Sequence, residues 1–256
     1  MSYLGHYSGC GNTFILLDDR DQTFQEGDVE KISHLCSYPL SVDGLILIQD
    51  SVKAKFKMAF FNRDGSRAPM CGNGIRSMMQ CLLDLSLLPQ ETTQIETDDH
   101  IYTLKKESDF ISTLMAPIKN LETNLSFEYE KKRIPGYYLN SGTHHLVLVL
   151  DDISSIDINA IGSFFRHHPH FFPLGTNVNF VTPSFDHIRT FERGVEAETL
   201  ACGTGTYAAC YIAHTHFNLP LPIRMRTQSG EVIALEKEDN TFSLLGPPPK
   251  RLHPCS

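Results

Sequence analysis

The sequence predicts a mixed α/β (α+β) fold made of two domains related by a pseudo-two-fold axis, because one unit is repeated along the chain. A cysteine–glycine motif occurs as Met70–Arg76 and again as Ala201–Tyr207, and each copy opens a segment with apolar helical patterning. Strand-like segments surround both, which predicts a mixed or antiparallel sheet wrapped around a central apolar helix in each domain. The landmarks that repeat 130 or 131 residues apart are Gly11 and Gly142, Phe61 and Phe191, Cys71 and Cys202, Thr97 and Thr227, and Pro117 and Pro247.

The first copy is dominated by a helix predicted over residues 71–88, with Pro89 expected to end it. Its apolar residues, among them Ile75, Met78 and Leu82, cover much of its circumference, so the helix is expected inside the domain rather than on its surface. The other elements expected here are a buried strand after a glycine turn within 8–17, a helix over 28–36, and strands over 45–48, 53–61, 94–97, 100–105 and 110–115.

The second copy repeats this order around a helix predicted over residues 202–217, which ends before Pro220. Its strands are expected over 144–150, 177–181, 188–192, 223–227, 231–236 and 242–245.

These elements place the first domain at residues 1–117 and the second at 118–246, joined by a linker near 118–123. Residues 247–256 are expected to pack back onto the first domain.

The composition excludes several classes of protein. A hydrophobic content of 41% and a charged content of 20% are typical of a soluble globular protein, and a net charge of −8 argues against a general nucleic-acid binder. No apolar run approaches the length of a membrane span, and the first residues lack the pattern of a secretory signal. Seven cysteines without framework spacing favour reduced thiols, and we expect a cytoplasmic monomer or homodimer.

Two thiols at helix N-termini suit one particular reaction. Glycines leave backbone N–H groups free beside Cys71 and Cys202, where a thiol is placed to ionise. If the two cysteines face one another at the domain interface, one thiolate removes a proton from carbon while the other, as a thiol, delivers one to the opposite face. The result is inversion of a stereocentre without a cofactor. The free N–H groups of Gly72–Gly74 and Gly203–Gly205 could stabilise negative charge on the substrate.

At these residues the chain resembles a known family. The resemblance is collinear over nearly the whole sequence, and its two cysteine motifs, with Glu192-Arg193-Gly194 shortly before the second, are specific for the diaminopimelate epimerases, the PLP-independent amino-acid epimerases of lysine and peptidoglycan biosynthesis. The other segments that carry the resemblance are Gly9–Asn12, Phe61–Ser66, Gly142–His145 and Asn177–Phe180.

The resemblance implies roles for individual residues. Cys71 and Cys202 would be the two catalytic acid/base residues, and His145 and Glu192 would help to set their protonation states. Arg193 would pair with a substrate carboxylate through two parallel bonds. The full set of implied substrate-binding residues is Asn12, Asn62, Gly72, Asn73, Gly74, Asn177, Glu192, Arg193, Gly203 and Thr204.

The chain departs from the family pattern at three places. Thr13 stands where an aspartate is usual, Gly44 where a larger polar residue is expected, and Thr143-His144 where Asn-Pro is usual. These changes leave the chemistry intact and bear on substrate recognition. They suggest the hypothesis of a looser site that also accepts another acidic amino acid such as glutamate.

Other interpretations are weaker. Cys36, Cys81 and Cys210 are expected to be inert core residues. The cysteines and histidines lack the spacing of a zinc site, and the glycine-rich motifs lack that of a nucleotide loop, so neither a metal nor a nucleotide is expected. Racemisation of a different amino acid remains an alternative. A redox-sensing binding protein, whose two cysteines form a disulfide, is another.

Overall fold

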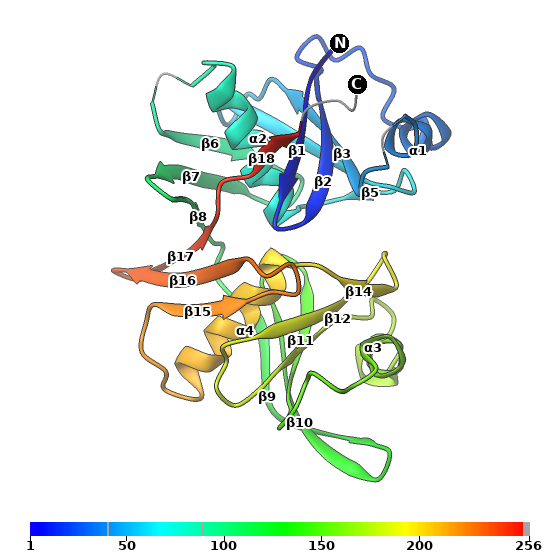
Figure 1. Cartoon of the computed structure of the whole chain (residues 1–256), viewed down its shortest axis with the longest axis vertical. Helices are drawn as coiled ribbons and strands as arrows, with labels where there is room; N and C mark the ends of the chain where they lie inside the picture. Colours follow the sequence, from blue (N-terminus) through cyan, green and yellow to red (C-terminus); the bar gives the residue numbers. More distant parts are fainter. Residues whose placement is uncertain (40, 89, 253–256) are drawn as a thin grey trace. The chain divides into compact units, whose positions relative to one another are not determined.

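The structure is a computed structural model that describes residues 1–39, 41–88 and 90–252 (Figure 1). The chain forms two compact units, one of Met1–Leu114 with Gly246–Ser256 and one of Met115–Leu245. Each combines hydrogen-bonded strands with helices that pack on them, so the predicted mixed α/β fold class is confirmed. The predicted boundaries, 1–117 and 118–246, differ from these units by no more than a few residues; that they are two epimerase domains stays a prediction.

The sheet of the first unit is mixed. Strands β2 and β3 run parallel, as do β4 and β6, whereas the other neighbours in this unit pair antiparallel. The strands lie in the order β8 (Phe110–Leu114), β7 (Ile101–Glu107), β6 (Thr92–Glu96), β4 (Phe56–Asn62), β3 (Gly44–Gln49), β2 (Asn12–Asp18), β1 (Ser2–Gly9) and β18 (Lys250–Leu252), with β5 (Arg67–Ala68) beside β4.

The buried strands of this unit have two apolar faces. Side chains alternate along β2, so Phe14 packs in the same cluster as Met78 of helix α2 (Gly72–Asp84), whereas Ile15 packs in the same cluster as Ile32 of helix α1 (Val29–Ser37). A continuous apolar run such as Phe14–Leu17 is what a sheet needs when helices cover both of its faces.

The hairpin between β1 and β2 places the first candidate residues. Gly9 pairs with Asn12, so only Cys10 and Gly11 form the turn, and both have positive φ, 50° and 85°. Two left-handed residues in a two-residue loop match the twist of the strands on either side. Asn12 therefore lies at the first position of β2, directly after the turn.

Helix α2 is shorter than predicted. It begins at Gly72, with Cys71 as its N-cap residue, and ends at Asp84 rather than at residue 88. It ends early because Ser86 adopts a left-handed conformation (φ 57°), which lets the N–H groups of Ser86 and Leu87 bond to carbonyls of the last turn. Pro89, which was predicted to end the helix, lies outside the described residues.

The second unit repeats this order of elements. Helix α3 (Ile158–Arg166) connects the parallel strands β11 and β12, as α1 connects β2 and β3, and helix α4 (Gly203–Thr215) follows β14 as α2 follows β5. One sheet has the order β14 (Ala197–Thr199), β13 (Ile188–Glu192), β12 (Asn177–Val181), β11 (His144–Val149), β10 (Lys132–Asn140) and β9 (Lys119–Tyr129), and β15 (Ile223–Arg226), β16 (Val232–Glu238) and β17 (Thr241–Gly246) pair antiparallel in succession.

The prediction of a linker near residues 118–123 is wrong. Most of this segment belongs to β9, which pairs with β10 in a long hairpin. The hairpin turns at Glu130 and Lys131, whose φ values of 49° and 64° are left-handed although neither residue is glycine or asparagine. Without those turn residues, and with most of β9 exposed and polar, the sequence carries little signal for a strand. Strand β10 and helix α3 were likewise not predicted.

None of the helices in the described part of the chain combines the length and the apolar character that crossing a membrane requires.

Candidate active site

Cys71 lies directly before the first residue of α2, with an extended backbone (φ −137°, ψ 115°). Its Sγ accepts a hydrogen bond from the Gly74 N–H at 3.3 Å, one of the N–H groups that a helix leaves without an internal partner in its first turn. The side chain is half-buried. Because the N-terminal end of a helix stabilises negative charge, this position suits a thiol that has to act as a thiolate.

A buried hydrogen-bond network fixes Asn73 beside Cys71. Asn73 Nδ2 donates to Asn12 Oδ1 at 2.7 Å, and Arg76 Nη2 donates to Asn73 Oδ1 at 2.6 Å. The Arg76 guanidinium is itself buried, and its Nη2 also lies 3.4 Å from Cys10 Sγ. The network joins two predicted substrate-binding asparagines, one from the start of β2 and one from the first turn of α2.

Asn62 and Asn12 lie where neighbouring strands of the sheet begin or end, on the same side of the unit. Phe14, Gly44 and Asn62 are neighbours across β2, β3 and β4, and Asn12 lies two residues before Phe14. The Asn62 amide Nδ2 donates to Ser66 Oγ at 3.0 Å, which closes the turn after β4. The described hydrogen bonds of Asn62 do not join it to the Cys71 network.

The packing around position 44 explains why the residue there is glycine. A Cβ atom there would lie 2.6 Å from the Phe60 ring and 2.6 Å from the backbone oxygen of Phe61. Both distances are far below van der Waals contact, and the backbone oxygen cannot move without disturbing β4. A larger polar residue, as the family pattern suggests, therefore requires a different packing of Phe60.

Thr13 is bound to a neighbouring carboxylate. Its backbone N–H and its hydroxyl both donate to Asp43 Oδ2, at 2.8 and 3.2 Å, and the Asp43 N–H donates back to the Thr13 carbonyl at 2.9 Å. The chain therefore has a carboxylate beside position 13 although it lacks the usual aspartate at that position.

Cys202 starts α4 as Cys71 starts α2, with an extended backbone (φ −120°, ψ 112°). It is more buried, with 8% of its surface exposed. Its Sγ lies 3.6 Å from the hydroxyl oxygen of Thr204, which sits in the first turn of the helix. The described side-chain contact of this sulfur is thus with a hydroxyl, whereas Cys71 Sγ accepts a backbone N–H.

His145 lies behind Thr204 and is completely buried. Its Nε2 is 3.0 Å from Thr204 Oγ1, and its Nδ1 is 3.1 Å from the amide nitrogen of Asn179. Burial, together with the positive charge of Arg193, lowers the pKa of His145 from 6.5 to about 3. The imidazole is therefore neutral at physiological pH, and its described contact on the side of α4 is the hydrogen bond with the Thr204 hydroxyl.

Asn177 holds the segment that contains Arg193. Its Nδ2 donates to Thr143 Oγ1 and to the His144 carbonyl, both at 2.8 Å, and its Oδ1 accepts the backbone N–H of Arg193 at 2.9 Å. Arg193 Nη1 donates to the Leu174 carbonyl at 2.9 Å. Its half-buried guanidinium is thus held by a carbonyl oxygen.

The structure brings most of the predicted residues together within each unit. Glu192, at the end of β13, accepts a hydrogen bond from the Thr199 hydroxyl at 2.5 Å. That the residues of both units act on one substrate stays a prediction. Beside Cys71 lie Asn12, Gly72, Asn73 and Gly74; beside Cys202 lie His145, Gly203 and Thr204, and Asn177 adjoins Arg193.

Sequence reasoning missed two buried residues of these networks, Arg76 and Asn179. Asn179 had a signal, because it follows Asn177 by two positions on a strand and so faces the same side. Arg76 had one as well, since a charged residue on an otherwise buried helix face needs polar partners.

The cysteines inside the helices differ from the two at helix starts. Cys36, Cys81 and Cys210 are fully buried. Burial raises the pKa of Cys36 and of Cys81 to about 11, and it also raises the pKa of Cys210. These thiols stay protonated at neutral pH, as expected for inert core residues. In the described part of the chain, no group of three or more His, Cys, Asp and Glu side chains could hold a metal ion.

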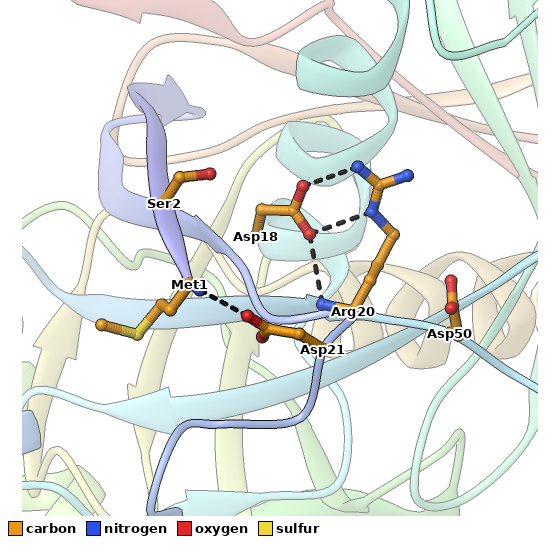
Figure 2. A pocket seen from close by; sticks show the side chains of 6 residues that line it. All are labelled: Met1, Ser2, Asp18, Arg20, Asp21 and Asp50. Atoms are coloured by element: carbon orange, nitrogen blue, oxygen red, sulfur yellow. Dashed lines mark hydrogen bonds and ion pairs between the residues drawn. The ribbon is translucent and has the colours of Figure 1, made fainter.

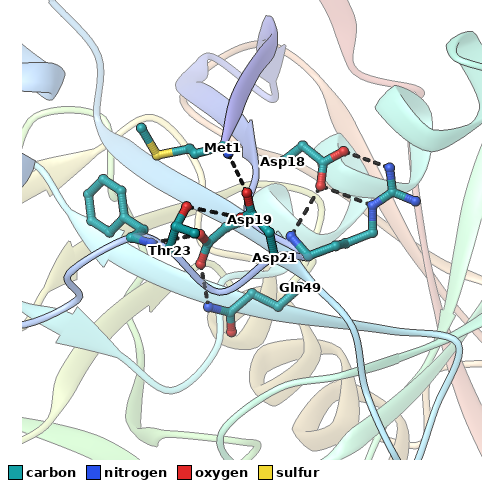
Figure 3. A network of polar contacts seen from close by, with 8 residues as sticks. Met1, Asp18, Asp19, Asp21, Thr23 and Gln49 are labelled. Atoms are coloured by element: carbon teal, nitrogen blue, oxygen red, sulfur yellow. Dashed lines mark hydrogen bonds and ion pairs between the residues drawn. The ribbon is translucent and has the colours of Figure 1, made fainter.

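A surface hollow of the first unit lies among charged residues other than the candidate ones. Figure 2 shows that two of its carboxylates are engaged: Asp18 binds Arg20 at 2.6 and 2.9 Å, and Asp21 binds the Met1 amino group at 2.7 Å. In Figure 3 the adjoining Asp19 accepts from Gln49 Nε2 at 2.9 Å. These contacts tie the segment after β2 to β3 and to the start of the chain, which is a structural role.

The family model for diaminopimelate epimerase matches residues 6–115 and 137–250, which is most of the chain. The chain belongs to the diaminopimelate epimerase family. Both cysteine helices and every candidate residue lie within the matched segments.

Relatives agree with this family membership, and solved structures share the fold. The diaminopimelate epimerase of a Hydrogenobaculum strain is 36% identical, over 95% of this chain and 94% of its own, and that of Flavobacterium psychrophilum is 34% identical, over 93% and 92%. The crystal structure of a PhzF-family phenazine biosynthesis protein from Bacillus anthracis has a TM-score of 0.71 at 13% identity, covering 96% of both chains. At that identity the likeness concerns the fold alone.

Proposed function

We propose that this chain interconverts LL-diaminopimelate and meso-diaminopimelate, with one acid/base thiol contributed by each unit. The observation that carries the proposal is the repeated placement of a cysteine at the start of a buried helix, in a member of the diaminopimelate epimerase family. A thiol at such a position has the donors that a thiolate needs, and the reaction needs two such groups.

The reaction moves two protons and no other atoms. One thiolate takes the α-proton, so an S–H bond forms as the C–H bond breaks, and the electron pair left on carbon spreads into the adjacent carboxylate. The other cysteine, present as a thiol, then gives its proton to the opposite face of the carbon and becomes a thiolate. The configuration is inverted, and the two sulfurs have exchanged protonation states.

The first turns of the two helices would stabilise the negative charge that develops. Asn73, Gly74, Gly203 and Thr204 would bind the carboxylate next to the reacting carbon, because free N–H groups at helix starts bind anions. Asn12, Asn62, Asn177, Glu192 and Arg193 would bind the rest of the substrate, with Arg193 paired to a carboxylate.

The proposal requires no cofactor, since the two thiols supply both proton transfers. Family membership supports diaminopimelate as the substrate over another amino acid, and an epimerase over a redox-sensing dithiol protein. The enzyme would act in the cytoplasm, as a monomer or homodimer, on precursors of lysine and peptidoglycan.

The test is epimerisation of a single stereoisomer of diaminopimelate in deuterated water without pyridoxal phosphate. We expect inversion together with deuterium at one α-carbon. In Cys71→Ala and Cys202→Ala, kcat should fall by about 10²–10⁴-fold, because each removes one acid/base group. Cys36→Ala, which removes a buried thiol outside the proposed site, is the matched control and should keep full activity. Inversion by either cysteine variant at the wild-type rate would refute the proposal.

A further inference from the structure

The orientation of the Asn179 amide follows from its neighbours. One amide N–H of Asn179 donates to the Leu146 carbonyl at 3.1 Å, and the amide oxygen accepts from the Thr190 hydroxyl at 3.1 Å. Because a carbonyl can only accept, the group that faces Leu146 has to be the NH₂ group. The second N–H of the same NH₂ group points at His145 Nδ1, 3.1 Å away.

This orientation determines which nitrogen of His145 carries the proton. Nδ1 accepts from the amide, so the hydrogen of the neutral imidazole is on Nε2. The ring is fully buried, and burial keeps it neutral by lowering its pKa to about 3. His145 therefore presents a hydrogen-bond donor on the side that faces helix α4.

The Nε2–H donor in turn orients the Thr204 hydroxyl. Two hydroxyl oxygens lie within reach of Nε2, Thr204 Oγ1 at 3.0 Å and Thr143 Oγ1 at 3.2 Å, and Thr143 also accepts from Asn177 at 2.8 Å. Once Thr204 Oγ1 accepts from His145, its own hydrogen is free to point at Cys202 Sγ, 3.6 Å away. The resulting chain of donors runs in one direction, toward the sulfur.

We propose that Asn179 is a positioning residue, which holds His145 as the Nε2–H tautomer so that the Thr204 hydroxyl donates to the Cys202 sulfur. This inference rests on the proposed function, because it assigns that hydroxyl to the thiolate of the reaction. A hydrogen bond to a charged sulfur is stronger than one to a neutral thiol, so the chain stabilises Cys202 as a thiolate.

The glycine of the cysteine motif supports this assignment independently. A Cβ atom on Gly205 would lie 2.2 Å from Asn179 Oδ1 and 3.3 Å from His145 Cε1. Only glycine leaves room for the amide under the first turn of α4. The second glycine of this motif therefore serves the Asn179–His145 pair.

The first experiment measures the tautomer directly, in the resting wild-type protein labelled with ¹⁵N-histidine. The ¹⁵N chemical shifts of His145 should show a protonated Nε2 and an unprotonated Nδ1 between pH 6 and 8. An Nδ1–H tautomer, or an imidazolium, would overturn the inference. This measurement requires no substrate, so it stands even if the protein fails to epimerise diaminopimelate, a result that would count only against the proposed function.

The second experiment uses Asn179→Asp, a change of similar size that replaces the donor by an acceptor. The new carboxylate would accept a hydrogen from Nδ1, so neutral His145 would carry its proton there, and Nε2 would accept the Thr204 hydrogen. At pH 8 we expect the Nδ1–H tautomer and a kcat about 10–100-fold lower, the loss of one hydrogen bond to a charged group, with KM nearly unchanged. Wild-type kcat with the wild-type tautomer would overturn the inference.

Thr190→Val is the matched control, because it removes the bond to Asn179 Oδ1 and leaves both amide donors in place. It should keep the Nε2–H tautomer and a kcat close to that of the wild type; a loss as large as that of Asn179→Asp would overturn the inference. If Asn179→Asp fails to fold, Asn179→Ser, which removes the amide donor without adding charge, replaces it under the same two criteria.

Discussion

The two helix starts that carry the candidate cysteines share a backbone plan and differ in what supports the sulfur. Cys71 accepts a backbone N–H, and the asparagine beside it is held by the buried guanidinium of Arg76. Cys202 lies against the Thr204 hydroxyl, behind which is the neutral, buried imidazole of His145. A repeated motif has thus kept its cysteine and its glycines while its supporting groups have become different.

This difference shows that similar sequence at the two motifs does not mean similar electrostatics. A guanidinium carries a permanent charge, whereas an imidazole supports its neighbour only in one protonation state and one tautomer. In the first unit a charged side chain therefore holds a candidate residue, whereas in the second the described partners beside the cysteine are neutral hydrogen-bonding groups. Substitutions at matched positions of the two units can separate these two modes.

The largest expected difference is between Gly205→Ala and Gly74→Ala. An alanine Cβ at 205 meets the Asn179 oxygen at 2.2 Å, whereas at 74 its nearest contacts are 3.2–3.4 Å. Gly205→Ala should lower the unfolding free energy by roughly 1–3 kcal/mol through overpacking. Gly74→Ala should be nearly neutral, because a gain of about 1 kcal/mol in helix propensity offsets the tighter contact. Urea unfolding of the three proteins at pH 7 measures both, and equal losses in the two variants would contradict the comparison.

The second comparison concerns the dependence of the unfolding free energy on pH, which per pH unit is expected to be smaller. Burial lowers the pKa of His145 from 6.5 to about 3, so between these values the unfolded chain binds a proton that the folded chain does not. Folded stability therefore falls on acidification, through this group by about 1.4 kcal/mol per pH unit below 6.5. His145→Gln should remove that contribution and flatten the decline in unfolding free energy between pH 6.5 and 4.5.

The matched variant in the first unit is Arg76→Met, which should keep the steep decline, because it leaves His145 and its buried surroundings unchanged. Both variants are measured by urea unfolding at pH 7, 6 and 5. A His145→Gln protein with the wild-type pH dependence would show that the imidazole is not neutral in the folded state.

The smallest expected difference concerns two buried serines. Ser141, which follows β10, donates to the Thr204 carbonyl at 2.8 Å, whereas Ser77 donates to the Asn73 carbonyl, four residues earlier in its own helix, at 2.9 Å. Ser141→Ala should cost about 1 kcal/mol of unfolding free energy, a typical net hydrogen bond. Ser77→Ala should cost close to nothing, since a serine bond to its own helix adds little. Thermal unfolding with a denaturant series resolves the two, and a reversed order would contradict this reading.

The elements around the cysteines could be predicted from the sequence because their signals are local. Apolar periodicity marked both central helices, and Asn177–Val181 and Ile188–Glu192 are strands with the predicted bounds. The β9–β10 hairpin could not be predicted, because its turn at residues 130–131 uses left-handed residues without glycine or asparagine. The early end of α2 could not be predicted for the same reason, since Ser86 takes the left-handed conformation that a glycine usually marks in a sequence.

The residues of the candidate site also fall into those that the sequence could predict and those that it could not. The cysteines and the glycines beside them could be named from the sequence, since a repeated motif and its spacing carry them, whereas the asparagines were named only through the resemblance to the family. The state of His145 could not, because it depends on an amide from a neighbouring strand and on complete burial. Arg76 and Asn179 were missed because their partners are close only in three dimensions.

One feature of the first unit bears on how the protein is made. Strand β1 pairs with β2 on one side and with β18 on the other, so a segment translated after the whole of Met115–Leu245 completes the run of strands from β8 to β1 that the first 114 residues form. On the ribosome, β1 is an unpaired edge until Lys250–Leu252 emerges, and such edges invite pairing with other chains. All strands of the second unit, by contrast, are translated before β18. In synthesis the unit that starts first is therefore the last to be finished.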